Sequence, residues 1–125
     1  LNLIPAAKVG HIGMYRNEET LEPVEYYCKL PSDINEREVF VLDPMLATGS
    51  SMELAYEALR TKGHPAHIHV ASIIASKQAI EYLQRKMPDD ITNIWVAAVD
   101  DELDDHSYIV PGLGDAGDLS YGEKE

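Results

Sequence analysis

The sequence has 125 residues, of which 22 are acidic and 10 are basic, so its formal net charge is −12. This length suits one domain with a single core. The negative charge repels phosphate backbones and argues against general nucleic-acid binding. No hydrophobic run approaches the roughly 20 residues of a membrane span, and the amino end lacks the layout of a signal peptide, so the cytoplasm is the expected compartment.

The first third of the chain predicts a strand and an arm. Residues 8–14 predict a strand, and residues 16–37, which contain two prolines, predict an extended arm or hairpin. Tyr26 and Tyr27 in this arm could stack on a base, or pack against the body of the protein or a second subunit. Cys28 is the single cysteine, so it cannot form an internal disulfide, and no chemical role is expected for it.

Strand and helix signals alternate through the middle of the chain. A buried strand is expected at residues 39–42, and two further strands at residues 67–75 and 94–99, because these runs are apolar and β-branched. Apolar residues at helical spacing predict helices around residues 52–59 and 79–87, with Ser76 as the N-cap of the second. This alternation with short connections predicts an α/β fold with a parallel sheet.

The segment from Val39 to Ser51 indicates a phosphate site. An apolar strand leads through Asp43 into a turn of small residues, Thr48-Gly49-Ser50-Ser51, that opens a helix. Backbone amides in such a turn can converge on a phosphate, helped by the helix dipole. A carboxylate at the end of the strand can hold sugar hydroxyls or a magnesium-bound group. The same turn can also simply cap a helix, so the spacing alone leaves both explanations open.

Two other groups of polar residues could bind metal but have simpler explanations. Five of the six residues 100–105 are acidic, a pattern that could hold a divalent ion but more commonly forms a solvated loop. The five histidines lack the i, i+4 spacing of a helical metal site, and His67 and His69 would share one face of a strand. We therefore expect structural roles for the histidines.

Three motifs in this chain resemble those of the uracil phosphoribosyltransferase family. Asp43-Pro44-Met45-Leu46-Ala47-Thr48-Gly49 resembles the family's loop for phosphoribosyl pyrophosphate (PRPP). Residues 13–24 resemble its pyrophosphate-contacting loop, and residues 106–118 resemble its C-terminal uracil-binding loop. The resemblance implies a phosphoribosyltransferase-type parallel sheet with flanking helices, a β-arm and a base-binding loop. It also implies one domain over residues 1–125 that lacks the family's amino-terminal section.

The activity implied by this resemblance is transfer of ribose 5-phosphate from PRPP to uracil, giving UMP and pyrophosphate, with Mg²⁺ accompanying PRPP. The catalytic residues would be Asp115, Arg16 and Asp43, and no metal would be held by the protein alone. PRPP would contact Arg16, Asp43, Pro44, Met45, Leu46, Ala47, Thr48, Gly49, Ser50, Ser51 and Asp115. Uracil would contact the Ile109 amide, the Gly114 carbonyl, the Ala116 amide and Asp115. The resemblance implies that the partners are these two substrates and further copies of the chain in a homo-oligomer. It implies no nucleic-acid or membrane partner.

Two of these residues also have ordinary explanations. Arg16 could be a surface arginine paired with Glu18 or Glu19, and the segment Asp115-Ala116-Gly117-Asp118 is typical of a turn.

The sequence departs from the family pattern at three places. Ser50 stands where a second glycine is expected, Lys77-Gln78-Ala79 replaces Pro-Glu-Gly, and Leu119-Ser120-Tyr121 replaces Arg-Leu-Phe. Together with the missing section, these departures predict little activity for the chain alone. Two alternative functions remain: a phosphoribosyltransferase for another base, and a catalytically silent nucleotide-binding or regulatory relative.

Overall fold

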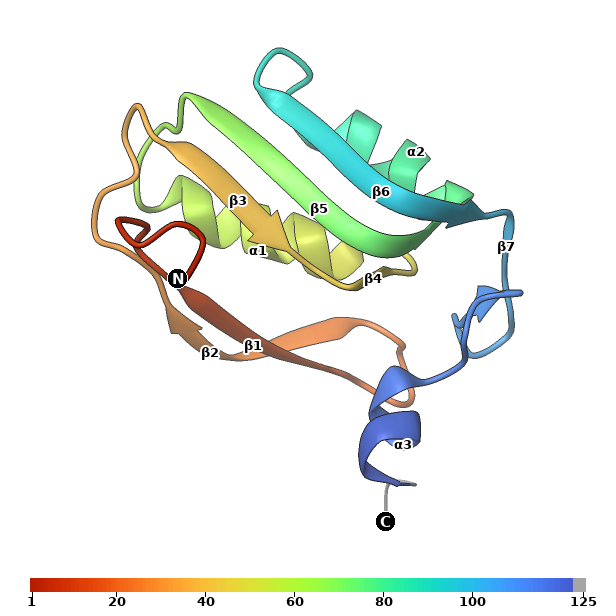
Figure 1. The fold of residues 1–125 in the computed structure, drawn as a ribbon. Coiled ribbons are helices and arrows are strands. Elements are labelled where there is room, and N and C mark those ends of the chain that lie inside the picture. The colour runs from red at the N-terminus through yellow and green to blue at the C-terminus, as the bar shows by residue number, and fades with distance from the viewer. Residues whose placement is uncertain (123–125) are drawn as a thin grey trace.

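The computed structural model describes residues 1–122 and is built around a parallel sheet (Figure 1). The sheet contains β3 (Glu38–Leu42), β4 (Met45–Leu46), β5 (His67–Ser76) and β6 (Thr92–Asp100). Strand β5 lies in the middle, with β3 and β4 paired along one side and β6 along the other, all parallel to it. The predicted α/β fold with a parallel sheet is therefore confirmed.

Two helices cover one face of this sheet and form the core with it. Helix α1 (Ser50–Arg60) buries Met52, Ala55 and Leu59, and α2 (Lys77–Lys86) buries Ala79 and Leu83. These side chains pack against β5, whose Ile68 and Val70 are fully buried. The predicted helices and their apolar stripes are therefore confirmed, because the helical spacing places these residues on one side of each helix.

The other face of the sheet is not covered within residues 1–122, so its strands alternate between buried and exposed side chains. In β3, Val41 packs against the core, whereas Phe40 and Leu42 are 59% and 74% exposed. The prediction of a fully buried strand at residues 39–42 was therefore wrong for half of its side chains. A continuous apolar run is typical of a parallel strand covered on both faces, and here only the face toward α1 and α2 is covered.

An antiparallel hairpin precedes the sheet, as predicted. Strands β1 (His11–Arg16) and β2 (Pro23–Lys29) pair with each other, with an irregularity between Gly13 and Met14. Tyr26 is 70% exposed, and its ring lies 6.2 Å from that of Tyr15 between centroids. Tyr26 therefore contacts Tyr15 within the hairpin and is not buried against the body of the protein. Stacking on a base and packing against a second subunit stay predictions for this side chain.

Short elements that the sequence did not predict follow β6. Strands β7 (Glu102–Leu103) and β8 (Ile109–Val110) pair antiparallel, and a short helix α3 (Ala116–Tyr121) comes next. In Figure 1 this segment extends away from the sheet. None of the helices in the described part of the chain is long and apolar enough to span a membrane.

Candidate functional site

The turn at residues 47–51 joins β4 to α1 at the carboxyl end of the sheet. Gly49 has φ +86°, a left-handed conformation that glycine adopts without strain. A Cβ at this position would lie only 3.0 Å from the Tyr82 ring and 3.3 Å from the Ala79 carbonyl oxygen. Since Ser50 begins the helix, the unpaired amides of the first turn of α1 follow directly. The turn therefore presents backbone N–H groups at a helix N-terminus, an arrangement that can bind an anion.

Two hydroxyls of this turn bind each other. Thr48 Oγ1 and Ser50 Oγ are 2.7 Å apart, and the Ser50 N–H donates to Thr48 Oγ1 at 3.4 Å. Ser50 stands where a second glycine was expected, and its side chain is accommodated by a hydrogen bond with the Thr48 hydroxyl. One hydroxyl hydrogen of the pair is used in that bond, so the other can donate to a ligand.

Ser76 fixes the start of the turn from the neighbouring strand. Its side chain is fully buried, and its Oγ accepts from the Ala79 N–H at 2.9 Å, which confirms the predicted N-cap of α2. The same hydroxyl donates to the carbonyl oxygen of Ala47. Sequence reasoning missed this second contact, because it depends on β4 lying beside the end of β5. Ser76 therefore connects the cap of α2 to the turn at residues 47–51.

Asp43 lies directly after β3 and is partly buried. Its Oδ1 accepts from the Met45 N–H at 3.2 Å. Burial raises the pKa of the Asp43 carboxyl above its usual value, and the bond from Met45 opposes this shift. The Pro44 carbonyl accepts from the Ile73 and Ile74 N–H groups at 3.1 and 3.2 Å, so the segment around Asp43 is fixed against β5.

Replacing Asp43 with asparagine is expected to raise the thermal midpoint near pH 7 while weakening binding of sugar hydroxyls. The raised pKa means that folding disfavours the charged form, so ionised Asp43 lowers stability above its folded pKa. The amide oxygen of asparagine can still accept from the Met45 N–H.

Thermal melts of Asp43→Asn and the unmodified chain test this expectation across pH. The difference should be largest near neutral pH and should shrink as the pH falls through the raised pKa of the native carboxyl toward that of an ordinary aspartate, because protonation removes the buried charge. An asparagine variant that is less stable at neutral pH would contradict the assigned cause.

The loop after β6 is shaped by acidic side chains. The Gly112 N–H donates to Asp100 Oδ2 at 2.9 Å, and Asp104 Oδ1 accepts from the His106 and Tyr108 N–H groups at 2.8 and 2.9 Å. Gly112 has φ +47°, and a Cβ there would collide with the carbonyl oxygen of Ile109. These acids therefore order the backbone of the predicted base loop, a role that their clustering in the sequence did not reveal.

The residues predicted to bind uracil lie along this loop. Ile109 is almost fully buried in β8, while Gly114 is exposed with φ +73°. Asp115 is the N-cap of α3, and its Oδ1 accepts from the Asp118 N–H at 3.0 Å. The alternative that Asp115 belongs to an ordinary turn is thus confirmed for its backbone role as a helix cap.

Arg16 is the last residue of β1 and stands opposite Pro23 in the hairpin. Within residues 1–122, no ion pair joins it to Glu18 or Glu19. Asn17 instead organises the following turn, since its Oδ1 accepts from the Glu19 and Thr20 N–H groups.

The three predicted motifs lie toward one end of the molecule. Because the strands of the sheet are parallel, the segments that follow them emerge at the same edge. Figure 1 shows the turn after β4, the β7–β8 segment and the end of the β1–β2 hairpin at this end. A cavity of about 400 Å³ lies elsewhere, between α2 and β6, and shares no residue with the three motifs.

Comparisons with known proteins agree with this arrangement. The family model for uracil phosphoribosyltransferase matches residues 1–122. Curated uracil phosphoribosyltransferases of Streptococcus pyogenes, from serotype M49 strain NZ131 and serotype M5 strain Manfredo, are 58% and 57% identical over 99% of this chain. The structure of the AQ2163 protein from Aquifex aeolicus superposes with a TM-score of 0.85 and 41% identity over 97% of this chain.

The chain is shorter than these relatives. It spans 58% of the length of each streptococcal protein and 56% of the Aquifex chain. The match nevertheless includes all three motifs, the parallel sheet and the turn at residues 47–51. The chain belongs to the uracil phosphoribosyltransferase family.

Proposed function

We propose that this chain carries the PRPP- and uracil-binding segments of a uracil phosphoribosyltransferase. The observation that carries the proposal is the turn at residues 47–51, which opens α1 beside the partly buried Asp43. In the proposed reaction, the bond from ribose C1 to pyrophosphate breaks and a bond from C1 to N1 of uracil forms. The N1 proton is released, and the products are UMP and pyrophosphate.

Positive charge develops on the ribose as the bond to pyrophosphate weakens, so placement and electrostatics would provide most of the rate enhancement. The backbone amides of the turn would hold the 5-phosphate, and Asp43 would accept the ribose hydroxyls. Arg16 would bind pyrophosphate oxygens with two parallel N–H donors. Asp115 would stabilise the ribosyl cation or accept the N1 proton.

Magnesium bound with PRPP is part of this proposal. Asp43 would supply one hard oxygen ligand, and residues 1–122 contain no group of three histidine, cysteine or acidic side chains that could hold a metal. This donor set fits a magnesium ion whose other ligands are substrate oxygens and water, as is common for this ion. When bound, the ion would neutralise charge on the departing pyrophosphate.

We further propose that the protein works in the cytoplasm as a homo-oligomer. The exposed hairpin supports the second point, because Tyr26 and Tyr27 are 70% and 48% exposed and are the type of side chain that interfaces use.

An NMR titration of the chain with three ligands tests the proposed site. UMP should shift the backbone amide signals of residues 47–51 and 109–116 together. Ribose 5-phosphate should shift only the first set, and uridine only the second. If UMP shifts neither set, the proposal is wrong, and if GMP shifts both sets as UMP does, another base is the substrate.

A further inference from the structure

Helix α2 contacts the turn at residues 47–51 at two points. At its N-cap, the Ser76 hydroxyl donates to the Ala47 carbonyl oxygen. Further along the helix, Tyr82 lies against Gly49, since a Cβ added to that glycine would be only 3.0 Å from Tyr82 Cδ1. The next residue, Leu83, comes within 3.5 Å of the same point. One helix therefore contacts the turn both at its start and at the glycine that precedes α1.

A carboxylate of α1 holds the Tyr82 ring in this position. The Tyr82 hydroxyl donates to Glu53 Oε2, and Lys86 Nζ lies 3.4 Å from Glu53 Oε1. Lys86 Nζ also lies 5.6 Å from the centroid of the Tyr82 ring, close enough for a cation–π attraction. Glu53 belongs to the first turn of α1, and its N–H donates to the Gly49 carbonyl oxygen at 3.1 Å. These three side chains therefore join α2 to the part of α1 that begins at Gly49.

The bond between Tyr82 and Glu53 is a strong one. A hydroxyl that donates to a carboxylate forms a charge-assisted hydrogen bond, which is stronger than a bond between neutral groups. The hydrogen bond to Glu53, burial and the negative charge of Glu53 all raise the pKa of Tyr82 above its usual value, so its hydroxyl keeps its proton at neutral pH. The ring is thus fixed against Gly49 before any ligand binds.

We propose that Tyr82 is a positioning residue for phosphate binding at residues 47–51. Its ring keeps Gly49 in the left-handed conformation with φ +86°, and its bond to Glu53 keeps the ring there. Tyr82 acts through the turn, whose N–H groups are thereby ordered in advance, and this lowers the entropic cost of binding a phosphate. The inference rests on the proposed function, in which this turn holds the 5-phosphate of PRPP or UMP.

Tyr82 also connects α1 to α2, so a purely structural role is the alternative. Loss of a structural contact would loosen the fold and weaken the binding of phosphate and base alike. Loss of positioning would weaken only the contact with the phosphate. UMP and uridine distinguish the two roles, because these ligands differ only in the 5-phosphate.

Tyr82→Phe removes the hydroxyl and keeps the ring, and calorimetry with UMP and with uridine measures the effect. The dissociation constant for UMP should rise severalfold, while that for uridine should stay unchanged. Tyr82→Ala removes the ring as well and should raise the constant for UMP further. UMP affinity that is unchanged in Tyr82→Phe, or an equal loss of affinity for UMP and uridine, would overturn the proposal.

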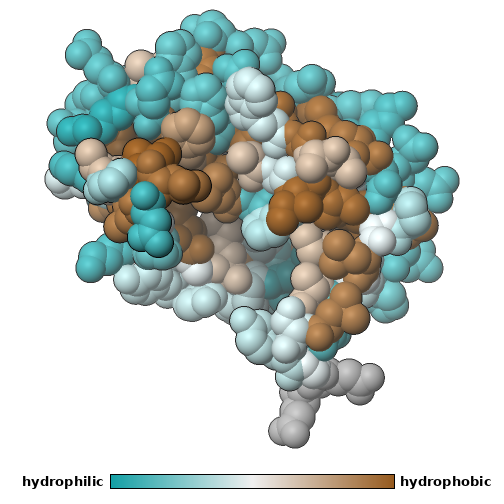
Figure 2. All heavy atoms as spheres, in the orientation of Figure 1, coloured by the Kyte–Doolittle hydropathy of each residue, from teal (hydrophilic) through white to brown (hydrophobic). Residues whose placement is uncertain are grey.

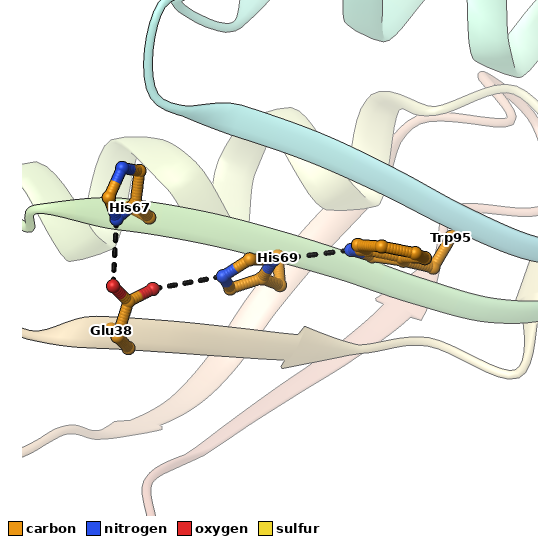
Figure 3. A network of polar contacts seen from close by, with 4 residues as sticks. All are labelled: Glu38, His67, His69 and Trp95. Carbon is orange, nitrogen blue, oxygen red and sulfur yellow. Dashed lines mark hydrogen bonds and ion pairs between the residues drawn. The ribbon is translucent and has the colours of Figure 1, made fainter.

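A second network of the same kind provides a matched control (Figure 3). Glu38 accepts from His67 Nδ1 at 2.7 Å and from His69 Nε2 at 2.9 Å. This network joins β3 to β5 on the face of the sheet away from α1 and α2, where Figure 2 shows hydrophobic side chains. His67→Phe removes one ring donor from a glutamate, as Tyr82→Phe does, and should leave UMP affinity unchanged. Equal losses of UMP affinity in the two variants would contradict a specific role of Tyr82.

A measurement without ligand separates this proposal from the proposed function. NMR relaxation of the ligand-free chain gives order parameters for the Gly49 and Ser50 amides. These should fall in Tyr82→Phe and stay unchanged in His67→Phe, and values equal to those of the native chain in Tyr82→Phe would overturn the proposal. If UMP does not shift residues 47–51 of the native chain, the proposed function is wrong, and the order parameters still decide whether Tyr82 holds the turn.

Discussion

Thr48→Asp is expected to abolish UMP binding. The new carboxylate would stand in the turn at residues 47–51, where the phosphate of the ligand is proposed to lie. Two unit charges roughly 4 Å apart repel by about 4 kcal/mol near a protein surface, and the phosphate carries more than one charge. Since each 1.4 kcal/mol corresponds to tenfold in affinity, the expected loss is roughly three orders of magnitude or more. Calorimetric titration with UMP measures it.

Two control variants separate charge from shape at this position. Thr48→Asn has the shape of aspartate without its charge, so it should retain much more UMP affinity than Thr48→Asp. Thr48→Ser keeps a hydroxyl that can bond to Ser50, whose Oγ lies 2.7 Å from the native Thr48 oxygen, and should bind nearly as well as the native chain. UMP affinity unchanged in Thr48→Asp would show that the phosphate does not bind in this turn.

The secondary structure in the middle of the chain could be predicted because it depends on local spacing. The stripe from Met52 to Leu59 and the cap at Ser76 are properties of neighbouring residues, and both are present in the structure. The short elements after Asp100 could not be predicted in this way. Strand β8 has only the two residues Ile109 and Val110, too few to show a period.

Contacts between segments that are distant in the sequence could not be predicted either. The bond from Ser76 to the Ala47 carbonyl joins residues 29 positions apart, and the bond from Gly112 to Asp100 spans 12 positions. Each depends on which strands lie side by side. The same holds for Glu38, which bonds to both His67 and His69 only because β3 and β5 pair in that register.

The motifs of the candidate site could be recognised in the sequence, but the spatial arrangement of their residues could not be predicted from it. The turn that contains Gly49 was recognised because its glycine and hydroxyl residues follow a strand and begin a helix, and the structure gives Gly49 the left-handed conformation that favours glycine. The exposure of Phe40 and Leu42 could not be foreseen, because an apolar strand has the same sequence whether one face or both are covered.

Discrimination between UMP and CMP is expected to reach roughly several hundredfold in affinity. Both nucleotides carry the same ribose 5-phosphate, so the difference reports on the base loop alone. Uracil presents two carbonyl acceptors around an N3–H donor, a pattern that the proposed backbone groups of Ile109, Gly114 and Ala116 match. Cytosine replaces O4 with an amino donor and lacks the N3 proton, so two of these groups would face unsuitable partners.

The size of this preference follows from the cost of unpaired groups. A buried polar group left without a partner costs roughly 1 to 3 kcal/mol, and two such groups give the expected ratio. Competition calorimetry on the chain measures the two affinities. Equal affinities would mean that the loop at residues 109–116 does not read the base. A loss of UMP binding in Thr48→Asp would then still support binding of the 5-phosphate at residues 47–51, because UMP and CMP carry the same 5-phosphate.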